Sequence, residues 1–192
     1  MSLLDCIKRI PELNKEIVAN YPKQFECLSE CKGKIEKIVF VASGSSYNSA
    51  SVAKYFIENQ CELDVDVIYP NVFSQQKTHK KSDTILYVFI SQTGATKQVY
   101  NDVMDLQEKG YMVASIVGEL ESPIAKVSKN PINMGCKHEE YKYRTIGVST
   151  SIITCWLLGC YLSGFQDMDT LLAVNSQLDG IVEQALVWYE NH

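Results

Sequence analysis

Apolar residues along this chain recur in two spacings, one typical of strands and one typical of helices. Five short segments are almost continuously apolar, as expected of strands covered on both faces of a sheet. They are residues 35–41, 65–69, 84–90, 111–117 and 131–134. Other segments repeat apolar residues every three or four positions, which predicts helices at 47–60, 95–109, 123–127, 146–162 and 169–189. Strands that alternate with helices favour a parallel sheet with helices on both faces.

The two ends of the chain are predicted to be helical extensions of this sheet. Residues 3–31 are predicted to be helices with breaks or kinks at Pro11 and near Pro22. Within the chain, residues 71–81 are predicted to be a polar connection between a strand and the next strand. We therefore expect an α/β fold, a flavodoxin-like three-layer sandwich with a five-stranded parallel sheet and flanking N- and C-terminal helices. The expected division is 1–34 for the N-terminal helices, 35–165 for the central domain and 166–192 for the C-terminal helix.

Composition narrows the class of protein. A chain of 192 residues can form one substantial core. A net charge of -5, with no basic run larger than residues 77–81, argues against nucleic acid as a partner. Seven scattered cysteines and no visible export signal indicate a reduced, cytoplasmic protein. The apolar segment 146–162 carries serine, threonine and glycine, so we expect a buried helix and no membrane association.

Two hydroxyl-rich segments each follow a predicted strand and precede a predicted helix, and they are candidates for an anion site. They are residues 43–46, with sequence Ser-Gly-Ser-Ser, and residues 91–96, with sequence Ser-Gln-Thr-Gly-Ala-Thr. Helix N-termini attract phosphate, and ligands of parallel sheets bind outside the carboxyl ends of the strands. Together the segments predict a phosphate-ligand site. The alternative is that Ser91 or Thr93 only caps a helix.

The two loops match neither of the common nucleotide-binding patterns. No Gly-Lys-Ser/Thr follows at Walker A spacing, and residues 43–46 are not part of G-x-G-x-x-G. The segments SGSSYNSA, FISQTGAT and IGVSTSIIT instead resemble the SIS (sugar isomerase) family. The resemblance is to the first of the two SIS modules in glucosamine-6-phosphate synthase-like proteins, and it covers most of residues 35–165.

This resemblance implies a phosphorylated sugar as the ligand, and we expect no cofactor. Ser91, Thr93 and Thr96 would hold the phosphate. Ser45, Ser46 and Gln92 would contact the phosphate or the sugar hydroxyls, and Val148 and Ser149 match a family segment that approaches the sugar. Ala95 stands where the family often has glutamate, a departure that bears on the identity of the sugar.

Catalytic groups are less evident than binding groups. Aldose–ketose isomerisation needs a base for the proton transfer and an acid or base for ring opening. In the two-module synthases these groups lie mostly in the second module and the C-terminal tail. Glu58 resembles the base of some single-module isomerases, against the alternative of a solvated helix-end carboxylate.

Four further side chains are weaker candidates for chemistry. Glu139 and Glu140 are candidates to face a neighbouring subunit's site, and His79 and His138 to open the sugar ring. Cys136 to Glu139 offers metal-binding atom types, but one loop does not fix a tetrahedral site, and we expect no metal.

Taken together, these features predict a phosphosugar-binding protein that is part of an isomerase or deglycase acting on an amino-sugar or ketose phosphate. The expected partner is a second copy in a homodimer or a second SIS module. The alternative is a non-catalytic phosphosugar-sensing or regulatory subunit that uses the same pocket.

Overall fold

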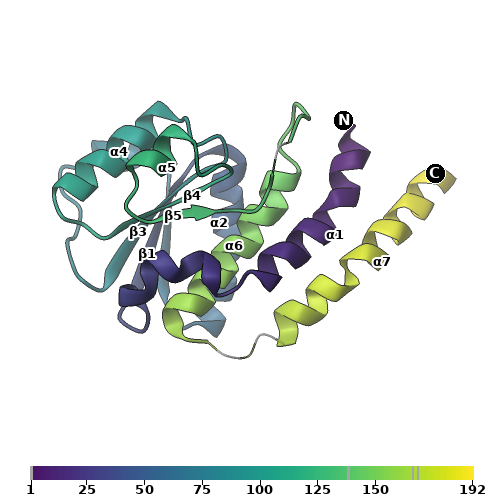
Figure 1. The fold of residues 1–192 in the computed structure, drawn as a ribbon, viewed down its shortest axis with the longest axis horizontal. Coiled ribbons are helices and arrows are strands. Elements are labelled where there is room, and N and C mark those ends of the chain that lie inside the picture. The colour runs from purple at the N-terminus through teal and green to yellow at the C-terminus, as the bar shows by residue number, and fades with distance from the viewer. Residues whose placement is uncertain (1, 138, 166, 168) are drawn as a thin grey trace.

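The computed structural model describes residues 2–137, 139–165, 167 and 169–192. The described chain forms three layers with a parallel sheet in the middle (Figure 1). The helices and strands follow one another as α1 (Leu3–Ala19), the 3-10 helix η1 (Lys23–Cys31), β1 (Lys37–Ala42), α2 (Gly44–Gln60), β2 (Asp64–Ile68), α3 (Pro70–Gln75), β3 (Ile85–Ser91), α4 (Lys97–Glu108), β4 (Val113–Val117), α5 (Pro123–Val127), β5 (Pro131–Asn133), α6 (Ile146–Ser163) and α7 (Asp169–Asn191).

The strand order is the one that characterises flavodoxin-like sheets. The five strands are parallel and lie in the order β2-β1-β3-β4-β5. The chain order therefore reverses between β1 and β3, which pair from Lys37 with Ile85 to Ala42 with Ile90. The predicted fold class is confirmed. The loops after β1 and β3 leave the sheet side by side at this switch point, where ligands of such sheets bind.

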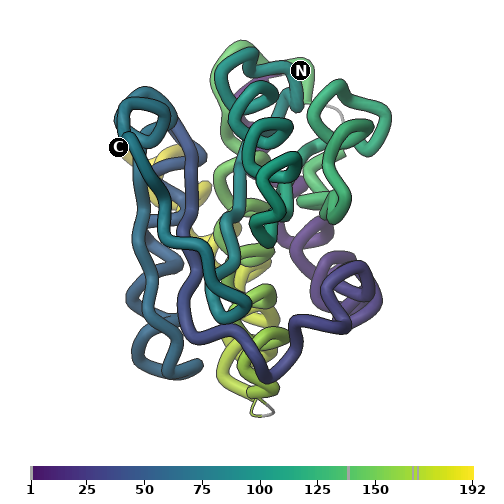
Figure 2. Tube along the Cα trace, turned by 90° about the vertical axis from the view of Figure 1, so that its left-hand side faces the viewer, coloured from purple at the N-terminus to yellow at the C-terminus, as the bar shows by residue number. Residues whose placement is uncertain are grey.

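The sheet is covered on both faces, which explains the continuous apolar character of its strands. Along β1, Ile38 and Phe40 belong to one buried cluster, whereas Val39 and Val41 belong to the other. The first cluster lies under α1, η1, α2 and α6, and the second under α3, α4 and α5. Figure 2 looks from the α4–α5 side, with the purple α1 and the yellow α7 mostly behind the sheet.

Helix α6 is the apolar helix that the sequence predicts to be buried. It is the one described helix that is long and apolar enough to cross a membrane, but 72% of it is buried inside the fold. Its residues Cys155, Leu158 and Leu162 are fully buried. Helix α6 therefore serves as the central helix of one layer, with α2 and α1 packed beside it.

Two local expectations are wrong: a break at Pro11 and an entirely irregular connection at 71–81. Helix α1 continues through Pro11, because Cys6, Leu13 and Ile17 on its buried face anchor it to the core on both sides of the proline. The predicted polar connection at 71–81 begins with the short helix α3, in which Pro70 occupies the first turn and Phe73 is buried. A proline that closes a strand can also open a helix, since its fixed φ suits the first helical turn.

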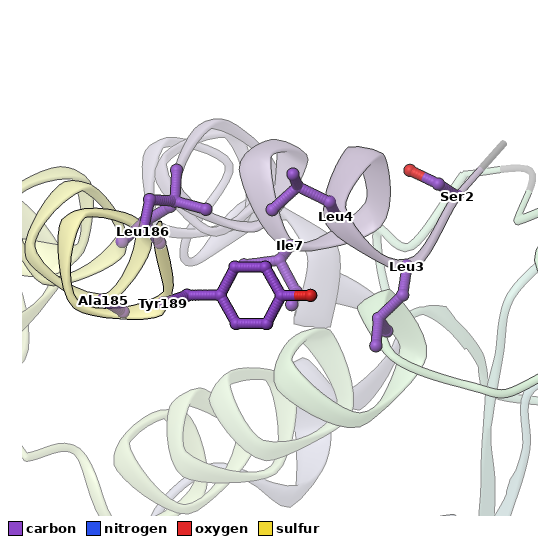
Figure 3. A pocket seen from close by; sticks show the side chains of 8 residues that line it. Ser2, Leu3, Leu4, Ile7, Ala185, Leu186 and Tyr189 are labelled. Carbon is purple, nitrogen blue, oxygen red and sulfur yellow. The ribbon is translucent and has the colours of Figure 1, made fainter. Parts of the chain in front are cut away.

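Helix α7 lies outermost and leaves an apolar surface exposed. Its buried residues are Leu171 and Asn175. Val174, Ile181 and Trp188, which recur every seven positions, are 49%, 54% and 64% exposed. An apolar groove of about 460 Å³ separates α7 from the first turns of α1, and Figure 3 shows the Tyr189 ring between the two helices.

Candidate functional site

The turn from β3 into α4 gathers hydroxyl groups in a compact loop. Ser91 ends β3 and is buried, and its Oγ lies 2.9 Å from Thr96 Oγ1, where either atom can donate. The backbone folds back as Gly94 N donates to Ser91 O at 2.9 Å. Thr93 Oγ1 accepts a hydrogen bond from Ala95 N at 3.3 Å. Three hydroxyl groups are thus held around one turn.

The helix that follows this turn begins without a side-chain cap. Thr96 is the N-cap residue of α4, but its side chain makes no capping hydrogen bond, since its hydroxyl pairs with Ser91 instead. The first N–H groups of a helix carry partial positive charge and need acceptors. The alternative, that Ser91 or Thr93 only caps the helix, does not agree with these hydrogen bonds, because Ser91 bonds Thr96 and Thr93 accepts from Ala95 N. An uncapped N-terminus beside three hydroxyls is suited to an anion.

The β1 loop brings a second helix start to the same edge of the sheet. Ser45 and Ser46 do not form a loop as expected, but lie in the first turn of α2, which begins at Gly44. The N-cap Ser43 makes no side-chain capping hydrogen bond either. Because β1 and β3 are neighbours, the open N-termini of α2 and α4 lie at the switch point together.

A third helix start, that of α6, is joined to α2 and to α1 by hydrogen bonds. Ser49 Oγ reaches the carbonyl oxygens of Ser45 at 3.0 Å and of Val148 at 3.2 Å, which links α2 to α6. Asn14 Nδ2 of α1 donates to Ser149 Oγ at 3.0 Å. Val148 and Ser149, both half-buried, are therefore held between α1 and α2.

The N-terminus of α6 differs from those of α2 and α4 because a carboxylate occupies it. Glu139, which is 7% exposed, accepts hydrogen bonds from the backbone N–H groups of Thr145 at 2.7 Å, Ile146 at 2.9 Å and Gly147 at 3.3 Å. Its Oε2 also accepts from Gln92 Nε2 at 2.9 Å. Glu139, a candidate to face a neighbouring subunit's site, makes these hydrogen bonds within its own chain. The backbone N–H groups at the start of α6 are therefore already paired with Glu139. The helix starts suited to an anionic ligand are those of α2 and α4.

Electrostatics agree with an ionised Glu139. Burial alone would raise the pKa of this carboxyl, but the hydrogen bonds from Gln92, Thr145, Ile146 and Gly147 outweigh it and hold the pKa below its ordinary value of 4.5. A carboxylate with several N–H donors is stabilised in its charged form. Glu139 is therefore a poor base at neutral pH.

Glu139→Gln is expected to destabilise the fold at neutral pH by about 1–3 kcal/mol, because charge-assisted hydrogen bonds at a helix start are replaced by neutral ones. A depressed pKa contributes stability that is present above the unfolded-state pKa and lost as pH falls through the folded-state value. The difference between variant and wild type should therefore shrink as pH falls below 4.5. Denaturant unfolding of both proteins across this range measures it, and a difference independent of pH would contradict the expectation.

The other candidate residues lie away from this edge. Glu58 is 12 residues after Ser46 on α2, so the two are about 18 Å apart along the helix axis, and its carboxylate lies 3.3 Å from Lys54 Nζ. A catalytic role for Glu58 stays a prediction, which this placement does not support. His79 stacks on Phe73 with ring centroids 3.9 Å apart, near Tyr87 in the first half of β3.

The loop before α6 contains the remaining candidates. Glu140 is exposed, and His138 lies outside the described residues. Within the part of the chain that the structure describes, no three metal-binding side chains come together. Sequence reasoning missed two residues that organise the site, Asn14 and Ser49. Ser49 follows four residues after Ser45 in the same helix, a spacing typical of serine bonding back to the preceding turn, but nothing local indicates Asn14.

A parallel sheet in this order, with hydroxyl-bearing helix starts at its switch point, defines a doubly wound α/β protein. Ligands of this fold class bind outside the carboxyl ends of the strands. The sequence model of the SIS domain matches residues 34–158. The chain belongs to the SIS domain family, and the resemblance inferred from the three motifs is confirmed.

One curated relative is similar to this chain in sequence, and two solved structures are similar in fold. The glutamine–fructose-6-phosphate aminotransferase (isomerizing) of Thermotoga maritima is 28% identical over 165 residues, which cover 85% of this chain and 25% of that protein. A candidate phosphosugar isomerase from Clostridium difficile 630 superposes with a TM-score of 0.83 at 23% identity, over 99% of this chain and 54% of the other. The glucosamine-6-phosphate deaminase of Thermotoga maritima gives a TM-score of 0.70 at 22% identity, over 93% and 50%. The chain thus spans a quarter of the aminotransferase and about half of each of the two structures.

Proposed function

We propose that this chain binds a phosphorylated sugar at the switch point and contributes to isomerase or deglycase chemistry on an amino-sugar or ketose phosphate. The observation that carries the proposal is the pair of uncapped helix starts, α2 and α4, with the hydroxyls of Ser91, Thr93 and Thr96 in the turn that leads into α4. The phosphate would lie on the turn after β3. Ser45, Ser46, Gln92, Val148 and Ser149 would contact the sugar or the phosphate. The aminotransferase relatives, which are named for fructose-6-phosphate, support this ligand class.

Thermal unfolding in the presence of fructose-6-phosphate, glucosamine-6-phosphate and inorganic phosphate tests the ligand class. A ligand that binds only the folded state at 100 times its dissociation constant stabilises by about 2.7 kcal/mol, which raises the melting temperature by several degrees. At millimolar phosphosugar we expect such a rise, and a smaller one with phosphate. No rise with any phosphosugar would rule out the assignment.

We further propose that the proton-transfer groups come from a second SIS unit, either a second copy of this chain or a second module. Glu139 is the carboxylate that is hydrogen-bonded to the hydroxyl-bearing segments. Four N–H donors already bind it, so it is a poor base for the proton transfer. An isomerisation assay on the isolated chain with fructose-6-phosphate, with Glu58→Gln beside it, tests this. Turnover by a chain that light scattering shows to be monomeric, abolished by Glu58→Gln with binding retained, would overturn the proposal.

We propose that the chain acts in the cytoplasm, where its seven free cysteines stay reduced.

We also propose that the chain associates with the second unit through α1 and the exposed face of α7. The stripe of Val174, Ile181 and Trp188 and the groove in Figure 3 are the apolar surface that a partner would cover.

Light scattering is expected to show a dimer that Ile181→Glu converts to monomers, because a buried unpaired carboxylate at an interface is costly. Val52→Glu on α2 is the matched control, since Val52 is 51% exposed and Ile181 is 54% exposed. The control should remain dimeric. A monomeric wild-type chain would contradict the proposal for a homodimer.

A further inference from the structure

The carboxamide of Gln92 lies in a slot lined by Gly147 and Glu139, with the Cys136 thiol as a further neighbour. Gly147 forms one wall, and a Cβ added to it would lie 2.0 Å from Gln92 Oε1 and 2.2 Å from Cδ. Glu139 forms another, with Oε2 at 2.9 Å from Gln92 Nε2. Gln92 is half-buried, so part of the residue remains exposed. Its side chain is held between the β3 turn and the first turn of α6.

The ionised state of Glu139 determines whether the NH₂ group or the carbonyl oxygen of the Gln92 carboxamide faces it. An ionised carboxylate only accepts hydrogen bonds, so the end of Gln92 that faces it must be the NH₂ group. The carbonyl oxygen Oε1 then lies against Gly147. The backbone N–H donors of Thr145 and Ile146 keep Oε1 of Glu139 engaged, which fixes Oε2 toward Gln92.

We propose that Glu139 is a positioning residue that fixes the orientation of the Gln92 carboxamide, so that Gln92 offers an acceptor oxygen to a hydroxyl or amino group of the sugar. The inference rests on the proposed phosphosugar function and deepens it, because it assigns a hydrogen-bond polarity to the sugar end of the site. Glu139 itself touches neither phosphate nor sugar. Its effect on binding is transmitted through Gln92.

Glu139→Gln is the informative variant because it keeps size and shape. The carbonyl oxygen of the new side chain still accepts from the N–H groups of α6, which leaves its NH₂ group facing Gln92. Two NH₂ groups cannot pair, so the Gln92 carboxamide turns over and presents a donor to the sugar. We expect fructose-6-phosphate to bind about tenfold more weakly to this variant by calorimetry, while the affinity for inorganic phosphate is unchanged.

A double-mutant cycle separates positioning from general structural damage. In a Gln92→Met background, which keeps the length of the side chain but removes its amide group, Glu139→Gln should have no further effect on phosphosugar affinity. Glu108→Gln, at the exposed end of α4, is the control for loss of one negative charge and should bind like the wild type.

The outcomes distinguish this inference from the function on which it rests. A wild-type chain that binds no phosphosugar would refute the proposed function itself. If the wild type binds, then an unchanged affinity in Glu139→Gln, or equal losses for phosphosugar and phosphate, would overturn the positioning role. Persistence of the loss in the Gln92→Met background would overturn it as well.

Discussion

Replacing Ser91 by Ala and Thr96 by Val together is expected to weaken fructose-6-phosphate binding about 30-fold or more. In the proposed complex each hydroxyl would turn its single proton to a charged phosphate oxygen, and a hydrogen bond to a charged group contributes about 1.5–3 kcal/mol against about 1 kcal/mol for the neutral bond between the two hydroxyls that is given up. The net loss in the double variant is then about 2–5 kcal/mol, where about 1.4 kcal/mol is tenfold in affinity. Calorimetric titration with fructose-6-phosphate measures the loss directly.

The double substitution is chosen because it leaves the fold intact. The two hydroxyls bond each other at 2.9 Å, and removing both partners avoids a buried hydroxyl without a partner. Thr96 makes no side-chain cap on α4, so no helix cap is lost. We therefore expect the free energy of unfolding to change by less than about 1 kcal/mol.

A second pair of hydroxyls provides the control. Ser82 Oγ and Thr84 Oγ1 lie 3.0 Å apart just before β3 begins, whereas Ser91 and Thr96 follow its other end. Ser82→Ala with Thr84→Val should not change phosphosugar affinity. If the Ser91/Thr96 double variant folds and binds as tightly as this control, the phosphate does not bind at the turn after β3.

The fold was predictable because its signals are local or periodic. Residues such as Ile38 and Phe40 are buried on one face of the sheet and Val39 and Val41 on the other, so the apolar run at β1 is diagnostic from sequence alone. The break expected at Pro11 does not occur, because packing of the helix on the core outweighs the low helix propensity of proline. The proline costs one backbone hydrogen bond, while buried residues on both sides hold the helix on the core.

The site was only partly predictable, because its hydrogen bonds join residues that are far apart in sequence. The hydroxyls at 91–96 follow from strand and helix signals. Glu139 lies 47 residues from Gln92 and six before Thr145, outside the three-residue spacing of a capping box. Asn14 lies 135 residues from Ser149. One signal was available: Gly147 in the first turn of an apolar helix indicates a close approach, and Gln92 makes that approach.

Gly94→Ala is expected to cost about 3 kcal/mol of stability and to abolish phosphosugar binding. Gly94 has a φ of +60°, which an alanine adopts only with strain, and an added Cβ would lie 2.0 Å from Ser122 Oγ and 2.3 Å from Ser122 Cβ. The Cβ of Ser122 is fixed by its backbone, so relief requires the turn itself to move. Denaturant unfolding measures the first effect and calorimetry the second.

Gly33→Ala separates the backbone strain from the close approach. Gly33 has a φ of +71° with nothing within 4 Å of an added Cβ, so its substitution should cost only the strain, about 1 kcal/mol. The excess cost at Gly94 then measures how tightly the turn after β3 packs against Ser122, where Gly94 O also accepts from Ile124 N at 2.9 Å. Equal costs at the two glycines would mean that the turn can shift freely. The hydroxyls of Ser91 and Thr96 would then not be held in advance for a phosphate, and the rigid site inferred from their hydrogen bond would be wrong.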